Sequence, residues 1–261
     1  MNKRKILLLA MSLCMVAILA VGGTLAYFTA EDDATNVFTM GYVDIDLKEE
    51  FKQNSDLVPG LDINKDVWVK NTGDNDTYVR VHIAIPANMD DGNPDFNASK
   101  NFLHWNFPGA SMEAGKWSFL PEYSEGTGYK GNGAGNWNYY TTSIYNKDLK
   151  KNVEYAVYVA TYRTALKAGQ ETEIILDKVY LDATVNAVPT RDENNVVTSV
   201  IYTDTKGNKI TLTPEEMNAI HVKVWAEATQ VETFDNAYEA LNTAFGVPGT
   251  YNPWTTELEA E

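Results

Sequence analysis

The chain has 261 residues, 44% of them hydrophobic, with a formal net charge of −15 and a single cysteine. A chain this acidic is a poor partner for nucleic acid or for an anionic membrane surface, because both are polyanions. Its length is enough for one sizeable domain or for two small ones.

The first 26 residues have the composition of a secretory signal peptide. Basic residues occupy positions 3–5, an apolar run follows, and Thr24 and Ala26 are the small residues expected before a cleavage site. The alternative is a retained membrane anchor, which needs about 20 apolar residues, whereas this run is shorter and ends in glycines. We therefore predict cleavage between Ala26 and Tyr27 and a mature, secreted chain of residues 27–261 that forms a single domain.

Cleavage would remove three positive charges, which changes the formal net charge from −15 to −18. It would also remove Cys14, the only cysteine, so the mature chain would have no disulfide although an exported compartment permits one. Its fold must then rest on packing and hydrogen bonds. We expect it at the cell surface or in the extracellular matrix, without attachment to the membrane.

Alternation of apolar and polar residues with a period of two dominates the mature chain and predicts half-buried β-strands. The strands are expected at residues 43–47, 66–70, 79–85, 153–159, 173–185 and 220–228, with a hairpin over 196–212 that turns near Gly207. Strands joined by turns indicate a sandwich or a barrel rather than an α/β fold.

Two turns separate the early strands. Pro59 fixes φ and Gly60 permits a positive φ, which together fit a tight turn. Residues 71–76 are rich in Asn, Asp and Gly and link the second predicted strand to the third. Both turns are expected at the surface.

Two helical segments are predicted near the C-terminus. Apolar residues recur at helical spacing over 234–245, and Gly246 and Pro248 mark the end of that helix. A shorter helical turn is expected to start at Pro214, with Thr213 as its N-cap.

Residues 88–150 differ from the rest of the chain because glycine, asparagine and aromatic residues are crowded there. The aromatic residues are Phe96, Phe102, Trp105, Phe107, Trp117, Phe119, Tyr123, Tyr129, Trp137, Tyr139 and Tyr140. We predict a large insertion between two core strands, with short strands near Trp117 and Tyr139. Loops of this length are usually functional or packed on themselves.

Four stretches of the sequence carry a family resemblance: residues 22–28, residues 36–45, residues 57–60 with 65–73, and residues 226–230. The motif residues in the last two stretches are Pro59, Gly60, Asn71, Gly73, Glu227, Ala228 and Gln230. In this order they resemble the TasA and camelysin (CalY) family. These are exported proteins of Gram-positive bacteria that a dedicated signal peptidase, SipW, processes. The resemblance does not cover residues 88–150.

The resemblance implies an all-β fold, a jelly-roll-like antiparallel β-sandwich. It also implies assembly into extracellular fibres of the biofilm matrix, in which the mature N-terminal segment of one subunit completes the sheet of the next. The implied partners are other copies of the chain, the signal peptidase during export, and other matrix proteins or polysaccharide. No cofactor is implied.

An unpaired sheet edge is a template for another strand, and a donated strand binds through main-chain hydrogen bonds and side chains that enter pockets. We therefore expect a donor strand within residues 28–47. The residues expected in the acceptor groove are Phe28, Val37, Val43, Ile45 and Leu47, and Gly41 would allow close approach of the backbone. The alternative keeps this strand in its own sheet.

Two other functions compete with a fibre subunit. The aromatic residues of 88–150 would suit a monomeric surface adhesin or binding module. Camelysin-like proteins also carry a metalloendopeptidase label, but zinc hydrolysis needs three protein ligands. His82, His104 and His221 lack His-Glu-x-x-His spacing. We expect His82 and His221 on exposed strand faces and His104 in a loop, and we predict no catalytic residue, no metal site and no enzymatic activity.

Overall fold

The computed structural model describes residues 42–51, 57–90, 102–106, 116–123 and 137–254, all within one compact unit. The predicted signal peptide and cleavage site lie outside the described residues, as do the predicted donor residues Phe28, Val37 and Gly41. In the part that is described, no helix is long and apolar enough to cross a membrane.

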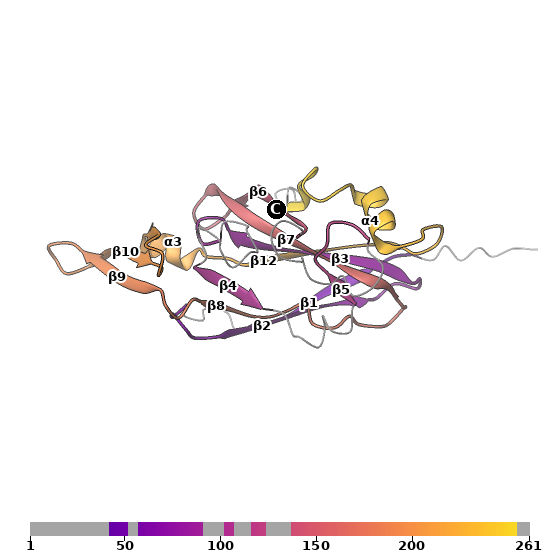
Figure 1. Cartoon of the computed structure of the whole chain (residues 1–261), viewed down its shortest axis with the longest axis horizontal. Helices are drawn as coiled ribbons and strands as arrows, with labels where there is room; N and C mark the ends of the chain where they lie inside the picture. Colours follow the sequence, from indigo (N-terminus) through magenta and orange to yellow (C-terminus); the bar gives the residue numbers. More distant parts are fainter. Residues whose placement is uncertain (1–41, 52–56, 91–101, 107–115, 124–136, 255–261) are drawn as a thin grey trace, which may run out of the picture. The chain divides into compact units, whose positions relative to one another are not determined.

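Two antiparallel sheets form a β-sandwich (Figure 1). The first has the order β1 (Ile45–Phe51), β2 (Ile63–Asn71), β8 (Leu176–Leu181) and β4 (Leu103–Asn106). The second has the order β12 (Lys223–Gln230), β3 (Thr77–Pro86), β7 (Lys151–Leu166) and β5 (Trp117–Ser118), and β6 (Tyr139–Asn146) also pairs with β7. This arrangement confirms the predicted all-β sandwich.

A third, smaller sheet contains β9 (Asn186–Arg191), β10 (Val197–Thr203) and β11 (Lys209–Leu212). The predicted hairpin is confirmed, and Gly207 in its turn has a φ of 86°. The short helix α3 (Pro214–Asn218) follows. Its N-cap Thr213 forms the predicted cap and, with the Glu216 side chain, a reciprocal capping box.

The main core lies between the two larger sheets. On β7 the predicted apolar row, with Tyr155 and Val157, faces away from it. On β3 the predicted apolar row lies in this core. Val67 and Val69 of β2, Val81 and Ile83 of β3, and Ala160 of β7 belong to it and are fully buried. Alternating side chains of both sheets therefore meet in one layer, as in other sandwiches.

Strand β3 is buried on both faces, so the prediction of a half-buried strand is wrong at this position. Helix α4 (Ala237–Phe245), which confirms the predicted C-terminal helix, packs on the outer face of the second sheet, where Tyr78 contacts it. Ala84 on the same face packs near Trp254. The sequence of the strand gave no sign of this cover, because the covering residues are about 160 to 170 positions away.

The described parts of residues 88–150 belong to the sandwich. The predicted strands near Trp117 and Tyr139 are β5 and β6, and Phe102, Trp117 and Phe119 are fully buried in the main core. His104 lies in β4, so its prediction as a loop residue is wrong. These aromatic residues fill the core rather than form an open platform.

Candidate functional site

The sandwich is open along one side, between β1 and β12. In the described chain each of these strands is the last of its sheet and has a hydrogen-bonded neighbour on one side only. Two cavities, of about 430 and 1220 Å³, lie between them. We call the two cavities together the β1–β12 groove.

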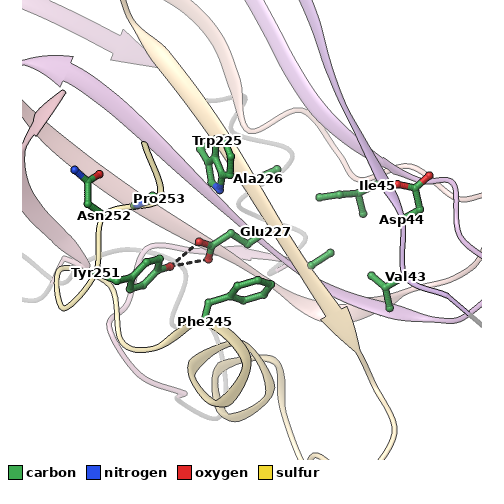
Figure 2. Close-up of a pocket in the computed structure, with 11 residues that line it drawn as sticks. Val43, Asp44, Ile45, Trp225, Ala226, Glu227, Phe245, Tyr251, Asn252 and Pro253 are labelled. Carbon is green, nitrogen blue, oxygen red and sulfur yellow. Dashed lines mark hydrogen bonds between the residues drawn. The ribbon is translucent and has the colours of Figure 1, made fainter. Parts of the chain in front are cut away.

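The smaller cavity surrounds the unpaired edge of β12 (Figure 2). Its lining residues are Val43, Asp44 and Ile45 at the start of β1, Trp225, Ala226, Glu227 and Ala228 of β12, and Phe245, Tyr251, Asn252 and Pro253. Ala226 and Ala228 pack against the main core, whereas Trp225 packs against the residues on the opposite face of the sheet. Side chains from both faces of β12 therefore line the same cavity.

The larger cavity is an opening into the main core. Core residues line it, namely Ile63, Met89, Leu103, Val179 and Leu181, together with Leu47 and Phe51 of β1 and Val222 and Val224 beside them. Charged groups line it too: Lys65 is almost fully buried, and its Nζ lies 3.0 Å from Glu49 Oε1. Protein interiors are normally packed with few voids larger than a water molecule, so among the described residues the core is incomplete at this edge.

A buried charge pair lies behind the smaller cavity. Arg80 of β3 faces Glu227 of β12 in the strand register. Arg80 Nε and Nη2 donate to Glu227 Oε2 at 2.9 and 2.7 Å, and the two side chains are only 2% and 4% exposed. The hydroxyl of Tyr251 also donates to Glu227, at 2.7 Å (Figure 2).

His82 belongs to the same cluster and is fully buried, so the prediction of an exposed histidine is wrong at this position. With its proton on Nε2, His82 donates to Glu227 at 3.3 Å and accepts from the Tyr140 hydroxyl at 3.1 Å. Burial lowers the pKa of His82, and this effect outweighs the hydrogen bond and negative charge of Glu227, which raise it. His82 is therefore neutral at pH 7.

Glu227 is ionised in this cluster. Burial alone would raise its pKa, but the hydrogen bonds from His82 and Tyr251 and the charge of Arg80 outweigh burial, and the pKa lies below the ordinary value. Burial also raises the pKa of the Tyr251 hydroxyl, so this group stays protonated and able to donate. One carboxylate thus faces one guanidinium, and the charge is balanced.

The cluster fastens the C-terminal segment to the second sheet. Arg80 Nη1 donates to the Asn242 side chain of α4 at 2.9 Å, and Nη2 donates to the Gly246 carbonyl at 3.3 Å. Phe245 and Tyr251, which line the smaller cavity, lie on this fastened segment. The charge pair therefore holds one wall of the β1–β12 groove in place.

The start of β1 is held by the turn after β2. The Asp44 carbonyl accepts from the amides of Thr72 and Gly73 at 3.0 Å each, and the Tyr42 carbonyl accepts from the Asp74 amide at 3.3 Å. Asn71 and Gly73 are buried, so the prediction that this turn lies at the surface is wrong for both residues. The backbone of residues 42–44 lies directly against Gly73, and the Asn71 side chain donates to the Asn75 and Leu166 carbonyls.

The structure brings most of the predicted site residues that it describes to one side of the sandwich. Val43, Ile45, Leu47, Glu227 and Ala228 line the groove. Asn71 and Gly73 hold the chain where it enters β1.

Three other motif residues do not line the groove. Gly60, with a φ of 77°, donates its amide to the Leu181 carbonyl at 3.0 Å, and Pro59 forms a bridge with Leu181, which confirms the predicted tight turn. Gln230 is the exposed last residue of β12.

Sequence reasoning missed Arg80, Phe245 and Tyr251. The sequence held one signal for Arg80: Arg80 and His82 alternate with apolar residues in a predicted strand. In the structure Arg80 lies opposite Glu227 in the register. The pairing of β3 with β12 is needed to use that signal. Nothing in the local sequence around Tyr251 indicates its contact with Glu227.

The three histidines lie in separate pairs. His82 contacts Glu227, His104 lies 3.0 Å from Asp182, and His221 lies 3.2 Å from Asp148. His221 is exposed as expected, but it precedes β12, so its prediction as a strand residue is wrong. Among the residues that the structure describes, no three His, Cys, Asp or Glu side chains gather in a metal-binding group. These residues do not fit a three-ligand zinc site, and the absence of enzymatic activity stays a prediction.

Residues 2–103 match the family model of the camelysin metallo-endopeptidases. No curated protein is significantly similar to the chain. The matched region includes the predicted signal peptide, the predicted donor segment and strands β1 to β3. The matched region is less than half of the chain, and over residues 2–103 it confirms the resemblance to the TasA and camelysin family that the sequence motifs indicated.

Proposed function

We propose that the mature chain is a secreted structural subunit of extracellular biofilm-matrix fibres. Each subunit would insert its N-terminal segment into the β1–β12 groove of the next. The observation that carries this proposal is the open edge of the sandwich, where apolar core residues line a cavity between two strands that are each paired on one side only. A strand added there would pair with a free edge and bury its side chains in the cavity.

The segment that we propose as donor is residues 28–41. Ile45 and Leu47, which the sequence placed in the donor strand, lie in β1, and β1 pairs with β2 along its whole length. Val43 lines the smaller cavity of its own chain. These three residues therefore belong to the acceptor groove of the described chain, and Phe28, Val37 and Gly41 remain as donor residues.

The length of the donor segment suits the groove. Strand β12 has eight residues, so it is about 26 Å long at the usual rise per residue. Residues 28–41 would span about 46 Å when extended. The segment is thus long enough to cover β12 and still connect two subunits.

The free edge of β12 is less protected against pairing than the free edges of β9 and β1. Strand β9 carries Pro189 and the charged Arg191, both typical of edges that resist pairing. Strand β1 carries a run of three charged residues at 48–50. On β12 the residues that surround the free edge include Ala226 and Ala228, which leave room for an incoming side chain.

Donation from one subunit to the next is a head-to-tail contact, which forms open filaments when it does not close on itself. The signal peptide directly precedes the proposed donor segment. Its removal after export would free this segment, so that subunits assemble outside the cell. The proposal involves no catalytic step.

Deletion of residues 27–38 tests this proposal. The mature chain of residues 27–261 should form fibres in electron micrographs, whereas the chain of residues 39–261 should elute as a monomer in size-exclusion chromatography. A chain in which residues 27–38 are scrambled is the matched control for length and charge, and it should also stay monomeric. Fibres of the shortened chain at normal yield would refute the proposal.

A further inference from the structure

The β1–β12 groove has two distinct ends. Lys223 and Val224, at the start of β12, line the larger cavity, whereas the residues from Trp225 to Ala228 line the smaller one. Strand β1 follows the same division, because its later residues line the larger cavity and its first residue, Ile45, lines the smaller. A strand that enters the groove can run in either of two directions, and the charges at the two ends distinguish them.

The larger cavity has a positively charged lining in an acidic chain. Lys65 and Lys223 line it together with one carboxylate, that of Glu49. With His221 neutral, two lysines and one glutamate give this lining a formal charge of +1, whereas that of the whole chain is −15. Lys65 donates to Glu49 at 3.0 Å. An ammonium group has three N–H donors, so a second carboxylate can join this pair.

The smaller cavity differs, because none of the described residues that line it is basic. Its two carboxylates are those of Glu227 and Asp44. Arg80 balances the charge of Glu227 from behind the cavity, whereas the Asp44 carboxylate accepts from the Thr72 hydroxyl, a neutral partner, at 2.8 Å. The groove is therefore positive at the start of β12 and negative toward its end.

The proposed donor segment, residues 28–41, has a matching division of charge. Its only charged residues are the adjacent Glu31, Asp32 and Asp33, and residues 34–41 after them carry no charge. An acidic end of the donor thus corresponds to a positive end of the groove. Complementary charges steer association and fix the register of an interface.

We propose that these charges set the direction of the donated strand. The acidic residues 31–33 of one subunit lie beside Lys65 and Lys223 of the next, and residues 34–41 continue along the free edge toward the end of β12. The donated strand then runs parallel to β12. This inference rests on the proposed fibre function and adds the orientation of the donor in the groove.

The opposite direction is disfavoured because it brings like charges together. An antiparallel donor would place residues 31–33 at the smaller cavity, where the lining carries only carboxylates. Parallel pairs are slightly less stable per residue than antiparallel ones, so main-chain hydrogen bonds alone would not select the parallel direction. One parallel register places Asp32 opposite Lys223. In the same register Val37 lies opposite Ala228, whose small side chain leaves room for it.

The test measures peptide binding to one acceptor, the chain of residues 27–261 with residues 27–38 scrambled. The probes are a labelled peptide of residues 28–41 and the same peptide with its three acidic residues changed to the corresponding amides, which we call the neutral peptide. At about 0.01 M salt the neutral peptide should bind about tenfold more weakly, and the difference should disappear toward about 1 M salt, where the Debye length is only about 3 Å. Only the peptide changes, so the acceptor groove is the same in both measurements.

Lys223→Glu tests the acceptor side. It should weaken binding of the wild-type peptide by about tenfold or more, because it places a carboxylate beside the acidic residues. Binding of the neutral peptide should stay unchanged, which shows that the groove is intact. Lys209→Glu is the matched control, since it makes the same change of charge at an exposed position of β11. It should leave the binding of both peptides unchanged.

Disulfide formation reports the direction of the strand. Val224 lines the larger cavity and Ala228 the smaller, and they are as far apart in the chain as Ala34 and Phe38 are in the peptide. The acceptor has no other cysteine. A peptide with Ala34→Cys should react with the Val224→Cys acceptor, and a peptide with Phe38→Cys with the Ala228→Cys acceptor. An antiparallel strand would exchange these partners.

Equal binding of the two peptides at low salt would overturn the proposed direction, and so would a preference for the exchanged disulfides. Either result would leave strand donation itself intact. A wild-type peptide that does not bind the acceptor at any salt concentration would instead refute the fibre proposal, and the direction with it. The two failures are therefore distinguishable.

Discussion

Arg80 and Glu227 show how a buried charge pair can be structural in a β-sandwich. Taking both charges out of water costs several kcal/mol per ion, and the cost is offset only because each group has several hydrogen-bond partners. The pair also joins β3, β12 and α4. Removal of one partner leaves the other charge buried and alone, which is the more damaging change.

Glu227→Gln should lower the free energy of unfolding by about 3 to 5 kcal/mol, the usual cost of breaking a buried ion pair. Urea denaturation at pH 7 measures it. Glu232→Gln, at an exposed position just after β12, is the control and should change stability by less than about 0.5 kcal/mol. If Glu227→Gln lowers the free energy of unfolding by no more than the control does, the charge pair does not hold the C-terminal segment.

His82 makes the stability depend on pH. The pKa of His82 in the folded chain lies below the ordinary value of 6.5. Between that folded pKa and pH 6.5, the unfolded chain therefore binds more protons than the folded chain. The contribution of His82 to the free energy of unfolding is fully present above pH 6.5, and it is lost as the pH falls toward the pKa of His82 in the folded chain. Glu227, whose pKa is also lowered, adds a loss in the same direction below pH 4.5.

His82→Gln should therefore flatten the decrease in unfolding free energy between pH 7 and pH 5, because glutamine can donate to Glu227 without titrating. His221→Gln, at an exposed histidine, is the control and should keep the wild-type slope. Equal slopes for wild-type protein and His82→Gln would contradict the assignment of a neutral, buried His82.

Among the elements of the fold, β12 is the strand proposed to accept the donated segment. Ala228 lines the smaller cavity, whereas Thr229, the next residue, does not. An inward-pointing charge is a common device that blocks pairing at a sheet edge. Ala228→Lys should therefore abolish binding of the peptide of residues 28–41 while the thermal transition stays cooperative.

Thr229→Lys places the same charge one position further along β12 and is the control for Ala228→Lys. It should retain peptide binding. If both variants bind the peptide with wild-type affinity, the free edge of β12 is not the acceptor.

The alternation located the strands at residues 43–47 and 153–159, because a period of two is typical of a strand. It did not show that residues 155–162 of β7 are buried on both faces. It failed at β3, where α4 and the C-terminal segment cover the second face. It also did not give the pairing of β2 with β8, which joins residues more than 100 positions apart. Alternation carries no information on such distant partners.

The candidate site was predicted in part. The family resemblance drew attention to Glu227, Asn71 and Gly73, but their roles were not evident from the sequence. Glu227 accepts hydrogen bonds from Arg80 and Tyr251, and Gly73 lies in close contact with the backbone of Tyr42. Each of these contacts joins segments that are distant in the chain, so only the folded structure brings them together.

For the whole molecule, the open side of the sandwich would link folding to the proposed assembly. A single described chain leaves a cavity of about 1220 Å³ among its core residues. A donated strand would fill this cavity and add main-chain hydrogen bonds along β12. Since binding to the folded state raises stability, subunits in a fibre should unfold at a higher temperature than free subunits.

The only cysteine, Cys14, lies in the predicted signal peptide, so a chain of residues 27–261 has none and every introduced cysteine is unique. This allows the most direct test of strand donation. One mature chain carries a single cysteine at one of the positions 37 to 40, the other carries Ala228→Cys, and the two are mixed and oxidised. We expect a disulfide between the two different chains for at least one of the positions 37 to 40. If no mixed disulfide forms, and a chain carrying both cysteines closes the disulfide within itself, the N-terminal segment stays in its own subunit and the proposed mode of assembly is wrong.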